Sequence, residues 1–218
     1  MLIIKFRIDT TLNLAIFMRH GQADNNVNRI LVGRHLESHL TEKGKMQVKE
    51  TARLLKNMSI SKIYSSPVTR TIETTQIVGE ELGLDYEIDD RLYEIDLGRL
   101  AGTNYDEVLN KYGNLFLSFY MGDDSVLSNH GVESFTAVKS RIRDLLDQIM
   151  TRHNNHNVLL VTHLDPIKAA ISYILDLKPE SLFKWHMRNA ALTILKQEFK
   201  TWSLSAVNFM GAQRYLYE

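Results

Sequence analysis

Four basic residues follow short apolar runs, in positions where they can bind one anion together. They are Arg19, His20, Arg70 and His163. An arginine guanidinium presents a planar set of N–H donors that matches the oxygens of a phosphate group. A neutral imidazole can act as a nucleophile or move a proton near pH 7. These residue types therefore favour a site for an oxyanion, above all for phosphate.

Each of these residues alone has an ordinary structural explanation. A single histidine after a strand is more often a surface or capping residue, and an arginine in the first turn of a helix is usually solvated. The occurrence of four such residues after apolar runs favours the phosphate hypothesis. Because the chain has no Walker-type glycine loop, side chains would have to hold the phosphate.

Composition excludes several classes of chemistry. The chain has 218 residues, with 26 Lys and Arg against 26 Asp and Glu, 8 His and no Cys. Without cysteine there are no disulfides, thiolate zinc sites, iron–sulfur clusters or cysteine nucleophiles. The balanced charge argues against nucleic acid as a partner.

No apolar stretch reaches the length of about 18 residues that a membrane span needs. The first residues, 1–13, carry Lys5, Arg7 and Asp9 among apolar side chains, unlike a secretory signal. We therefore expect a cytoplasmic protein without a membrane partner. The length favours a single domain over residues 1–218, in which residues 1–13 form an N-terminal extension or an extra edge strand.

Strand-like runs alternate with helical periodicity along the chain. We predict strands at Leu14–Met18, Ile63–Ser65, Tyr86–Ile88, Asn157–Thr162, Ala191–Lys196 and Trp202–Asn208, the last two as a hairpin. We predict helices from Thr41 as N-cap to Asn57, and at Pro67–Leu82, Asn104–Tyr112, Leu115–Met121, Glu133–His153, Pro166–Leu175 and Ser181–Trp185, with a polar loop at Gly122–Gly131. The alternation predicts an α/β three-layer sandwich, with a mostly parallel central sheet flanked by helices. Ligands of such folds bind beyond the carboxyl ends of the strands, where the four basic residues would meet.

An ordered set of motifs resembles that of the histidine phosphatase superfamily, whose fold is phosphoglycerate mutase-like. The resemblance covers about residues 14 to 208. Its motifs are Arg19-His20-Gly21 with Asn26, Gly33 and Leu40-Thr41-x-x-Gly44; Ser65-Ser66-Pro67-x-x-Arg70-x-x-x-Thr74; Arg91-Leu92-x-Glu94-x-x-x-Gly98-x-x-x-Gly102; Gly131-x-Glu133-Ser134; and Val161-Thr162-His163.

The resemblance implies a role for each matching residue. His20 would be the nucleophile that accepts the phosphoryl group, and Glu94 would be first a general acid and then a general base. A protonated His163 would assist catalysis and would bind the phosphate. The remaining phosphate ligands would be Arg19, Asn26 and Arg70. The resemblance implies neither a metal nor a cofactor, because the cations of the site would stabilise the transferring phosphoryl group.

The sequence departs from the family pattern at three places. Gln22 stands where the family often has an acidic residue. The stretch Gly33–His39 is one residue longer than usual, which should reshape the rim of the pocket. After His163 the chain has Leu164-Asp165-Pro166 where many relatives have glycine, and we predict that Asp165 caps the following helix.

Other histidines carry no catalytic prediction. His35, Glu37 and His39 form an H-x-E-x-H sequence, which lacks the spacing of a zincin, so we predict a surface or substrate-facing loop. His153 and His156 follow a predicted helix end, where a cation complements the helix dipole.

Three functions remain open. His163 lies only 69 positions after Glu94, which leaves little room for the insertion by which phosphoglycerate mutases shield phosphohistidine. The resemblance therefore favours a phosphomonoester hydrolase. A phosphoglycerate mutase-type phosphotransferase is the alternative, and a catalytically inactive phospho-ligand binding protein is a third hypothesis.

The resemblance implies a small phosphomonoester as substrate, and its identity stays open among sugar phosphates, phosphoglycerates and the ribazole phosphate of cobamide synthesis. The segment Leu100–Gly131 should form the rim of the pocket. Its aromatic residues either contact a ring of the substrate or pack within the short helices; they are Tyr105, Tyr112, Phe116, Phe119 and Tyr120. An edge strand could support a homodimer.

Overall fold

A computed structural model describes residues 13–122, 125–153, 156–211 and 214. Within these residues the chain forms one six-stranded sheet. Its strands are β1 (Leu14–Arg19), β2 (Ile60–Ser65), β3 (Tyr86–Ile88), β4 (Asn157–Thr162), β5 (Leu192–Glu198) and β6 (Thr201–Phe209). They lie in the order β3-β2-β4-β1-β5-β6.

The first four strands in that order are parallel, whereas β5 is antiparallel to both β1 and β6. Strands β1 and β4 occupy the centre of the sheet and are almost completely buried. Because β1, β2 and β4 run in the same direction, the residues that follow them meet at one edge of the sheet.

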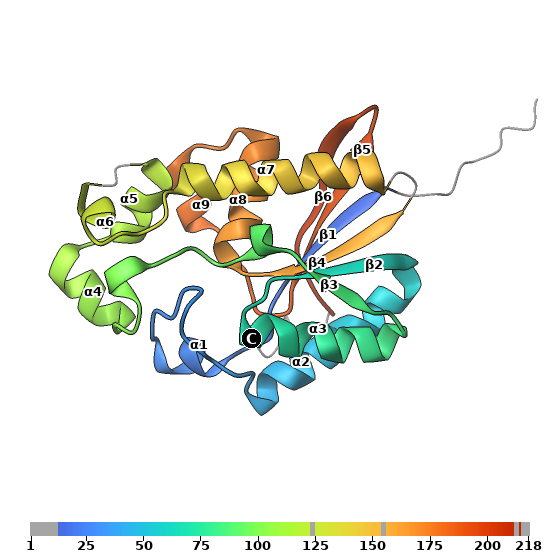
Figure 1. Cartoon of the computed structure of the whole chain (residues 1–218), viewed down its shortest axis with the longest axis horizontal. Coiled ribbons are helices and arrows are strands. Elements are labelled where there is room, and N and C mark those ends of the chain that lie inside the picture. Colours follow the sequence, from blue (N-terminus) through green and yellow to red (C-terminus); the bar gives the residue numbers. More distant parts are fainter. Residues whose placement is uncertain (1–12, 123–124, 154–155, 212–213, 215–218) are drawn as a thin grey trace, which may run out of the picture.

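Helices cover both faces of the sheet (Figure 1). The described helices are α1 (Asp24–Asn28), α2 (Glu42–Leu55), α3 (Thr69–Leu82), α4 (Tyr105–Tyr112), α5 (Leu115–Met121), α6 (Ser125–Asn129), α7 (Phe135–Arg152), α8 (Leu164–Leu175) and α9 (Pro179–Lys184). Three short 3₁₀ turns span Lys56–Met58, Asp90–Leu92 and Gly98–Leu100. Helices α2 and α3 pack on one face and α7 and α8 on the other, while α4 to α6 extend beyond the carboxyl ends of the strands (Figure 1).

Alternate residues of the central strands belong to two separate apolar cores. Ala15 and Phe17 of β1 pack with α7 and α8, whereas Ile16 and Met18 pack with α2 and α3. This alternation follows from the period of two in a strand. Burial on both faces explains why β1 reads as a continuous apolar run in the sequence.

The predicted fold class is confirmed: a mixed α/β sheet is flanked by helices. The closing hairpin is confirmed too, since β5 and β6 pair antiparallel around residues 199–200. Residues 1–12 lie outside the described residues, and so does the extra edge strand that we expected there. The assignment of residues 1–218 to a single domain stays a prediction.

The predicted loop at Gly122–Gly131 is wrong in part, because residues 125–129 form helix α6. Leu127 of this helix is buried against the apolar core that also contains Leu115 and Phe119. Tertiary packing thus stabilises a helical turn that its polar sequence did not indicate. Residues 123–124 of the predicted loop lie outside the described residues.

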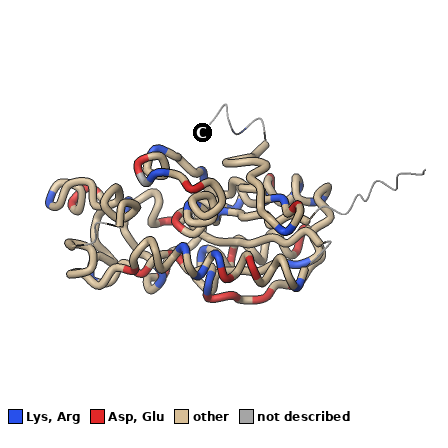
Figure 2. The backbone as a smooth tube through the Cα atoms, turned by 90° about the horizontal axis from the view of Figure 1, so that it is seen from above, with Lys and Arg blue, Asp and Glu red and all other residues tan. Residues whose placement is uncertain are grey.

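Acidic and basic residues are mixed along the backbone rather than separated into a basic and an acidic face (Figure 2). Attraction for an anionic ligand must therefore arise locally. None of the helices in the described ranges is both long and apolar enough to cross a membrane.

Candidate active site

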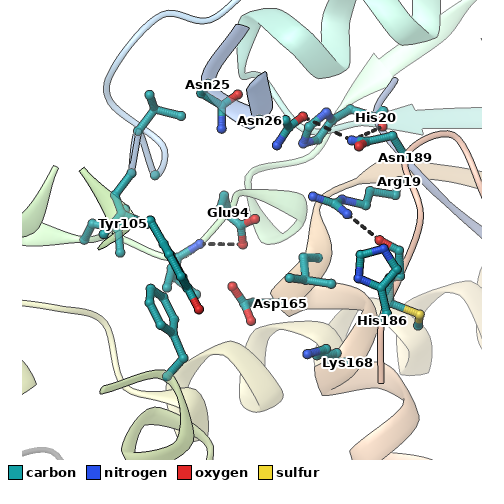
Figure 3. Close-up of a pocket in the computed structure, with 18 of the residues that line it drawn as sticks. Arg19, His20, Asn25, Asn26, Glu94, Tyr105, Asp165, Lys168, His186 and Asn189 are labelled. Carbon is teal, nitrogen blue, oxygen red and sulfur yellow. Dashed lines mark hydrogen bonds between the residues drawn. The ribbon is translucent and has the colours of Figure 1, made fainter. Parts of the chain in front are cut away.

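A cavity of about 560 Å³ opens at the carboxyl ends of the parallel strands. Five residues with a predicted role in the site line it: Arg19, His20, Asn26, Arg70 and Glu94. Figure 3 shows Arg19, His20 and Glu94 around the upper part of the cavity, with Asp165, Lys168 and His186 further down. The cavity is large enough for a small molecule in addition to a phosphate group.

His20 follows β1 and is only 2% exposed. Its Nδ1 donates to the carbonyl oxygen of Gly21 at 2.7 Å, and Arg70 Nε donates to its Nε2 at 3.2 Å. Burial, assisted by the charges of Arg70 and Arg19, lowers the pKa of His20 well below its ordinary value. The ring is therefore neutral at pH 7, with the proton on Nδ1 and the lone pair on Nε2.

Two arginines direct free N–H groups into the same region. Arg70 is 2% exposed and donates from Nη2 to the carbonyl oxygen of Gly33 at 2.9 Å, while Arg19 Nη1 donates to the carbonyl oxygen of Met187. Within the described part of the chain, Arg70 Nη1 and Arg19 Nε are buried without a hydrogen-bond partner. Burial lowers the pKa of Arg70 to about 10, so it stays charged at pH 7. Such buried donors without partners are expected where an anion binds.

His163 lies behind His20 and is not among the residues that line the cavity. Its ring meets that of His20 edge-on, with centroids 5.3 Å apart, and its Nε2 lies 2.8 Å from Ser66 Oγ. Its buried Nδ1 has no hydrogen-bond partner among the described residues. Complete burial and the charge of Arg70 lower the pKa of His163 well below its ordinary value. The protein groups thus favour the neutral ring, and the protonated His163 expected in catalysis stays a prediction.

Glu94 lies in the loop between two of the 3₁₀ turns, and its Oε1 accepts a hydrogen bond from the backbone N–H of Ile95 at 3.0 Å. Removal from bulk water raises the pKa of Glu94 to about 7, and the nearby Asp165 adds to this effect while Arg70 opposes it. A carboxyl group with such a pKa can both give and take a proton at neutral pH.

The Leu40-Thr41-x-x-Gly44 motif fixes the segment that follows the nucleophile. Thr41 caps helix α2 by accepting from Gly44 N–H at 3.0 Å, and its hydroxyl also donates to Gln22 Oε1 at 2.9 Å. A Cβ added to Gly44 would lie 2.0 Å from the carbonyl oxygen of Gln22. Only glycine therefore allows this helix to approach the backbone next to His20 so closely. In the second motif, Thr74 Oγ1 accepts from Gly21 N–H at 3.2 Å.

Asn26 lines the cavity, but protein groups already use its carbonyl oxygen. This Oδ1 accepts from Ala23 N–H at 3.0 Å and from Asn189 Nδ2 at 3.2 Å. Asn189 also donates to the carbonyl oxygen of His20 at 3.2 Å. Asn189 was missed from the sequence because it lies far along the chain, in a segment without a recognised motif. Ser66 was quoted within a motif, but its contact with His163 was not foreseen.

The prediction that Asp165 caps a helix is wrong. Helix α8 begins at Leu164, two residues earlier than predicted, so Asp165 lies inside its first turn. Its carboxylate accepts a hydrogen bond from the Tyr120 hydroxyl at 2.7 Å and lines the cavity. Burial raises the pKa of Asp165. Lys168, one turn further along α8, also lines the cavity and lies over the Tyr120 ring at 4.7 Å.

The remaining sequence candidates lie outside the cavity. His35 pairs with Asp96 at 2.9 Å and His39 with Glu73 at 2.6 Å, both on the surface. Of the lengthened stretch, only Gly33 lines the cavity. His153 is the C-cap of α7, and its Nε2 lies 2.9 Å from the Tyr64 hydroxyl. Within the described ranges no group of three or more His, Asp or Glu side chains could hold a metal ion.

The predicted aromatic rim divides into two sets. Tyr105 and Phe116 stack with ring centroids 5.1 Å apart and line the cavity together with Tyr120. Tyr112 instead contacts His130, and Phe119 packs against Phe135. An aromatic wall that the sequence did not indicate comes from the last turn of α9 and the residue that follows this helix. Its cavity-lining members are Phe183 and Trp185.

Comparison with known proteins gives a consistent result. The family model of the histidine phosphatase superfamily (branch 1) matches residues 15–210. The chain is 32% identical over 204 residues to a 2,3-bisphosphoglycerate-dependent phosphoglycerate mutase of Thermoplasma acidophilum, covering 93% of this chain and 97% of the relative. It is 30% identical over 186 residues to phosphoserine phosphatase 1 of Hydrogenobacter thermophilus, covering 84% and 86%.

The fold also resembles that of a solved structure. A mycobacterial glucosyl-3-phosphoglycerate phosphatase in complex with VO3 superimposes with a TM-score of 0.79, at 28% identity, over 89% of this chain and 98% of that one. The family model spans both the strand-end residues and the closing hairpin, so the whole cavity falls inside the match. The chain therefore belongs to the histidine phosphatase superfamily and is an enzyme of the histidine phosphatase type.

Proposed function

We propose that this protein hydrolyses small phosphomonoesters through a phosphohistidine intermediate on Nε2 of His20. The observation that carries this proposal is the arrangement at the top of the cavity. There the lone pair of a neutral imidazole lies beside buried N–H donors of Arg19 and Arg70 that have no partner among the described residues. Fixed cationic donors beside a nucleophile can stabilise the negative charge on the phosphoryl oxygens in the transition state of transfer.

In the first step His20 Nε2 attacks phosphorus, and the bond from phosphorus to the leaving oxygen breaks. Glu94 gives its proton to that oxygen, which is consistent with a pKa near 7 for its carboxyl group. Arg19 and Arg70 stabilise the equatorial oxygens. Ser66 donates to Nε2 of His163, so that its Nδ1 carries the proton and supports the phosphoryl group from behind His20.

In the second step water hydrolyses the phosphohistidine. The ionised Glu94 takes a proton from the water, whose oxygen attacks phosphorus, and the bond between phosphorus and nitrogen breaks. Inorganic phosphate leaves and His20 is restored. No metal and no cofactor takes part in this scheme, since the arginines supply the positive charge.

Hydrolysis is favoured over transfer because the cavity mouth is accessible to water. Four of the lining residues are exposed to solvent: Arg29, Phe183, Lys184 and His186. A phosphoglycerate mutase-type phosphotransferase is the second candidate, favoured by the 32% identity to a mutase over nearly the whole chain.

The proposal also includes a cytoplasmic location, a homodimer and a contact between Asn26 and the phosphate group.

The test is hydrolysis of p-nitrophenyl phosphate by the EDTA-treated protein beside its His20→Ala variant. We expect metal-independent turnover that falls about 10⁴-fold or more in the variant, as when a covalent nucleophile is removed. Turnover by neither protein would exclude the phosphatase proposal and favour an inactive phospho-ligand binding protein. Interconversion of 2- and 3-phosphoglycerate, faster than release of phosphate, would favour the mutase.

A further inference from the structure

The lower part of the cavity contains a buried lysine that forms no direct ion pair among the described residues. Lys168 is 4% exposed and lines the cavity below Asp165 in Figure 3. It makes no hydrogen bond and no ion pair with the described part of the chain, and its Nζ lies over the face of the Tyr120 ring, 4.7 Å from the ring centroid. A buried ammonium is costly unless an anion accompanies it.

Two carboxyl groups lie near enough to act on this ammonium, since the charges of Asp165 and Glu94 oppose the lowering of the Lys168 pKa by burial. Neither forms an ion pair with Lys168 among the described residues, and Oδ1 of Asp165 accepts the Tyr120 hydroxyl at 2.7 Å. Arg29 pairs with Asp106 instead. Lys168 is therefore a buried cation of the cavity that has no role in the proposed binding of phosphate by Arg19 and Arg70.

We propose that Lys168 binds a carboxylate on the leaving group of the substrate, so that the preferred substrates are phosphomonoesters of small carboxylic acids. This inference rests on the proposed phosphatase function and names its substrate class. Asp165, next to Lys168, would accept a hydrogen bond from a hydroxyl or an amine on the carbon beside that carboxylate. Both O-phosphoserine and 3-phosphoglycerate carry such a pair of groups.

Three properties of the site support a carboxylate. The lysine ammonium has three donors and shares the cavity with the nucleophile, so one molecule can reach both. The aromatic ring of Tyr120 holds the ammonium without neutralising its charge. The names of relatives agree, since phosphoglycerate, phosphoserine and glucosyl-3-phosphoglycerate all contain a carboxylate.

The first experiment compares matched substrates on the wild-type protein. The pairs are O-phosphoserine with O-phosphoethanolamine, and 3-phosphoglycerate with glycerol 3-phosphate. The second member of each pair has a hydrogen or a hydroxymethyl group, respectively, in place of the carboxylate. We expect kcat/KM to be about 10- to 100-fold higher for the carboxylated member, the range of a hydrogen bond to a charged group. Equal kcat/KM within both pairs would overturn the proposal. A preference in the phosphoserine pair alone would identify the amine as the hydrogen-bond donor to Asp165, and a preference in the phosphoglycerate pair alone would identify the hydroxyl.

The second experiment uses Lys168→Met and Lys168→Arg. We expect Lys168→Met to raise KM for the carboxylated members and to leave their non-carboxylated partners within about threefold, whereas Lys168→Arg keeps part of the preference. An equal loss on both members would show a structural role and overturn the proposal. Lys111→Met is the matched control, because Lys111 lies over the ring of Tyr112 at 4.9 Å outside the cavity.

Binding provides a readout that does not need turnover. Calorimetric titration with 3-phosphoglycerate and with glycerol 3-phosphate should show the same preference in the wild-type protein and its loss in Lys168→Met. If the wild-type protein hydrolyses no phosphomonoester but binds 3-phosphoglycerate more tightly, the hydrolase proposal fails and the carboxylate site stands. If Lys168→Met does not fold, the wild-type pairs and Lys168→Arg still decide the question.

Discussion

The two ends of the cavity are built in different ways. At the phosphate end, Arg19 is the last residue of β1, His20 follows it, and Arg70 lies in the first turn of α3 after β2. All three are fixed by hydrogen bonds to the backbone. At the leaving-group end, Tyr120 comes from α5 and Asp165 and Lys168 from α8, and they mainly contact one another. The phosphate end thus rests on the rigid centre of the sheet, while the leaving-group end rests on surrounding helices.

This difference separates chemistry from recognition. Side chains anchored at the ends of buried strands keep the geometry that phosphoryl transfer needs. Residues on peripheral helices can differ between relatives without disturbing that geometry. We therefore expect substitutions at the phosphate end to affect every substrate equally, and substitutions at the leaving-group end to affect substrates selectively.

The largest of these effects is expected for Arg70→Lys. A lysine cannot contact His20, the carbonyl oxygen of Gly33 and a phosphate oxygen simultaneously, as the arginine fork can. We expect kcat/KM to fall about 10²- to 10³-fold, the usual effect of losing one transition-state donor. Initial rates with p-nitrophenyl phosphate and with alkyl phosphates measure it, and Arg143→Lys on the surface is the control. A loss confined to one substrate would contradict the uniform role of this end.

Glu94→Gln should produce a loss that depends on the leaving group. An alkoxide needs a proton, so we expect kcat/KM for alkyl phosphates to fall about 100-fold or more. The value of kcat/KM for p-nitrophenyl phosphate should change little, because p-nitrophenolate leaves with little help and kcat/KM does not include the later hydrolysis of the phosphohistidine. In the wild-type protein the protonated acid disappears as pH rises through its pKa of about 7, so kcat/KM for alkyl phosphates should decline above that pH. Equal losses for both leaving groups would argue against a general acid at this position.

Gly44→Ala tests the framework of the phosphate end. The added methyl group would meet the Gln22 carbonyl oxygen at 2.0 Å, so the backbone beside His20 must move. We expect the free energy of unfolding to fall by about 1–3 kcal/mol, the typical cost of overpacking, and activity to fall with it. Urea denaturation measures this change. Gly211→Ala, where nothing lies within 4 Å, should be neutral, and similar losses in the two variants would refute the close-packing explanation.

The smallest effect is expected for Asp165→Asn. The negative charge of Asp165 contributes to the raised pKa of Glu94, so its removal should lower that pKa. Because the protonated acid is then lost at lower pH, the alkaline limb of the pH profile should move to lower pH, with a change of only a few fold in kcat at pH 6. Profiles of kcat/KM on glycerol 3-phosphate check this, and an unmoved limb would show that desolvation alone sets the pKa of Glu94.

Much of the phosphate end was predictable from the sequence. The apolar runs before His20 and His163 identified central strands, and residues at the ends of parallel strands must lie together. The leaving-group end was not predictable, since Lys168 looks like any lysine in a helix until α8 is placed against the cavity. Asp165 was misread for a related reason: Pro166 suggested a helix start two residues too late.

The sequence by itself determined the α/β fold and the group of residues at the ends of its strands. It could do so because strand burial follows from local apolar patterning, and the parallel direction of the strands follows from their alternation with helices. Only the tertiary structure decided which buried donors lack a partner among the described residues, that burial lowers the pKa of His163, and that Lys168 lines the cavity. The physical reason is that pKa values and unpaired donors depend on burial and on neighbours from distant segments, which no local pattern encodes.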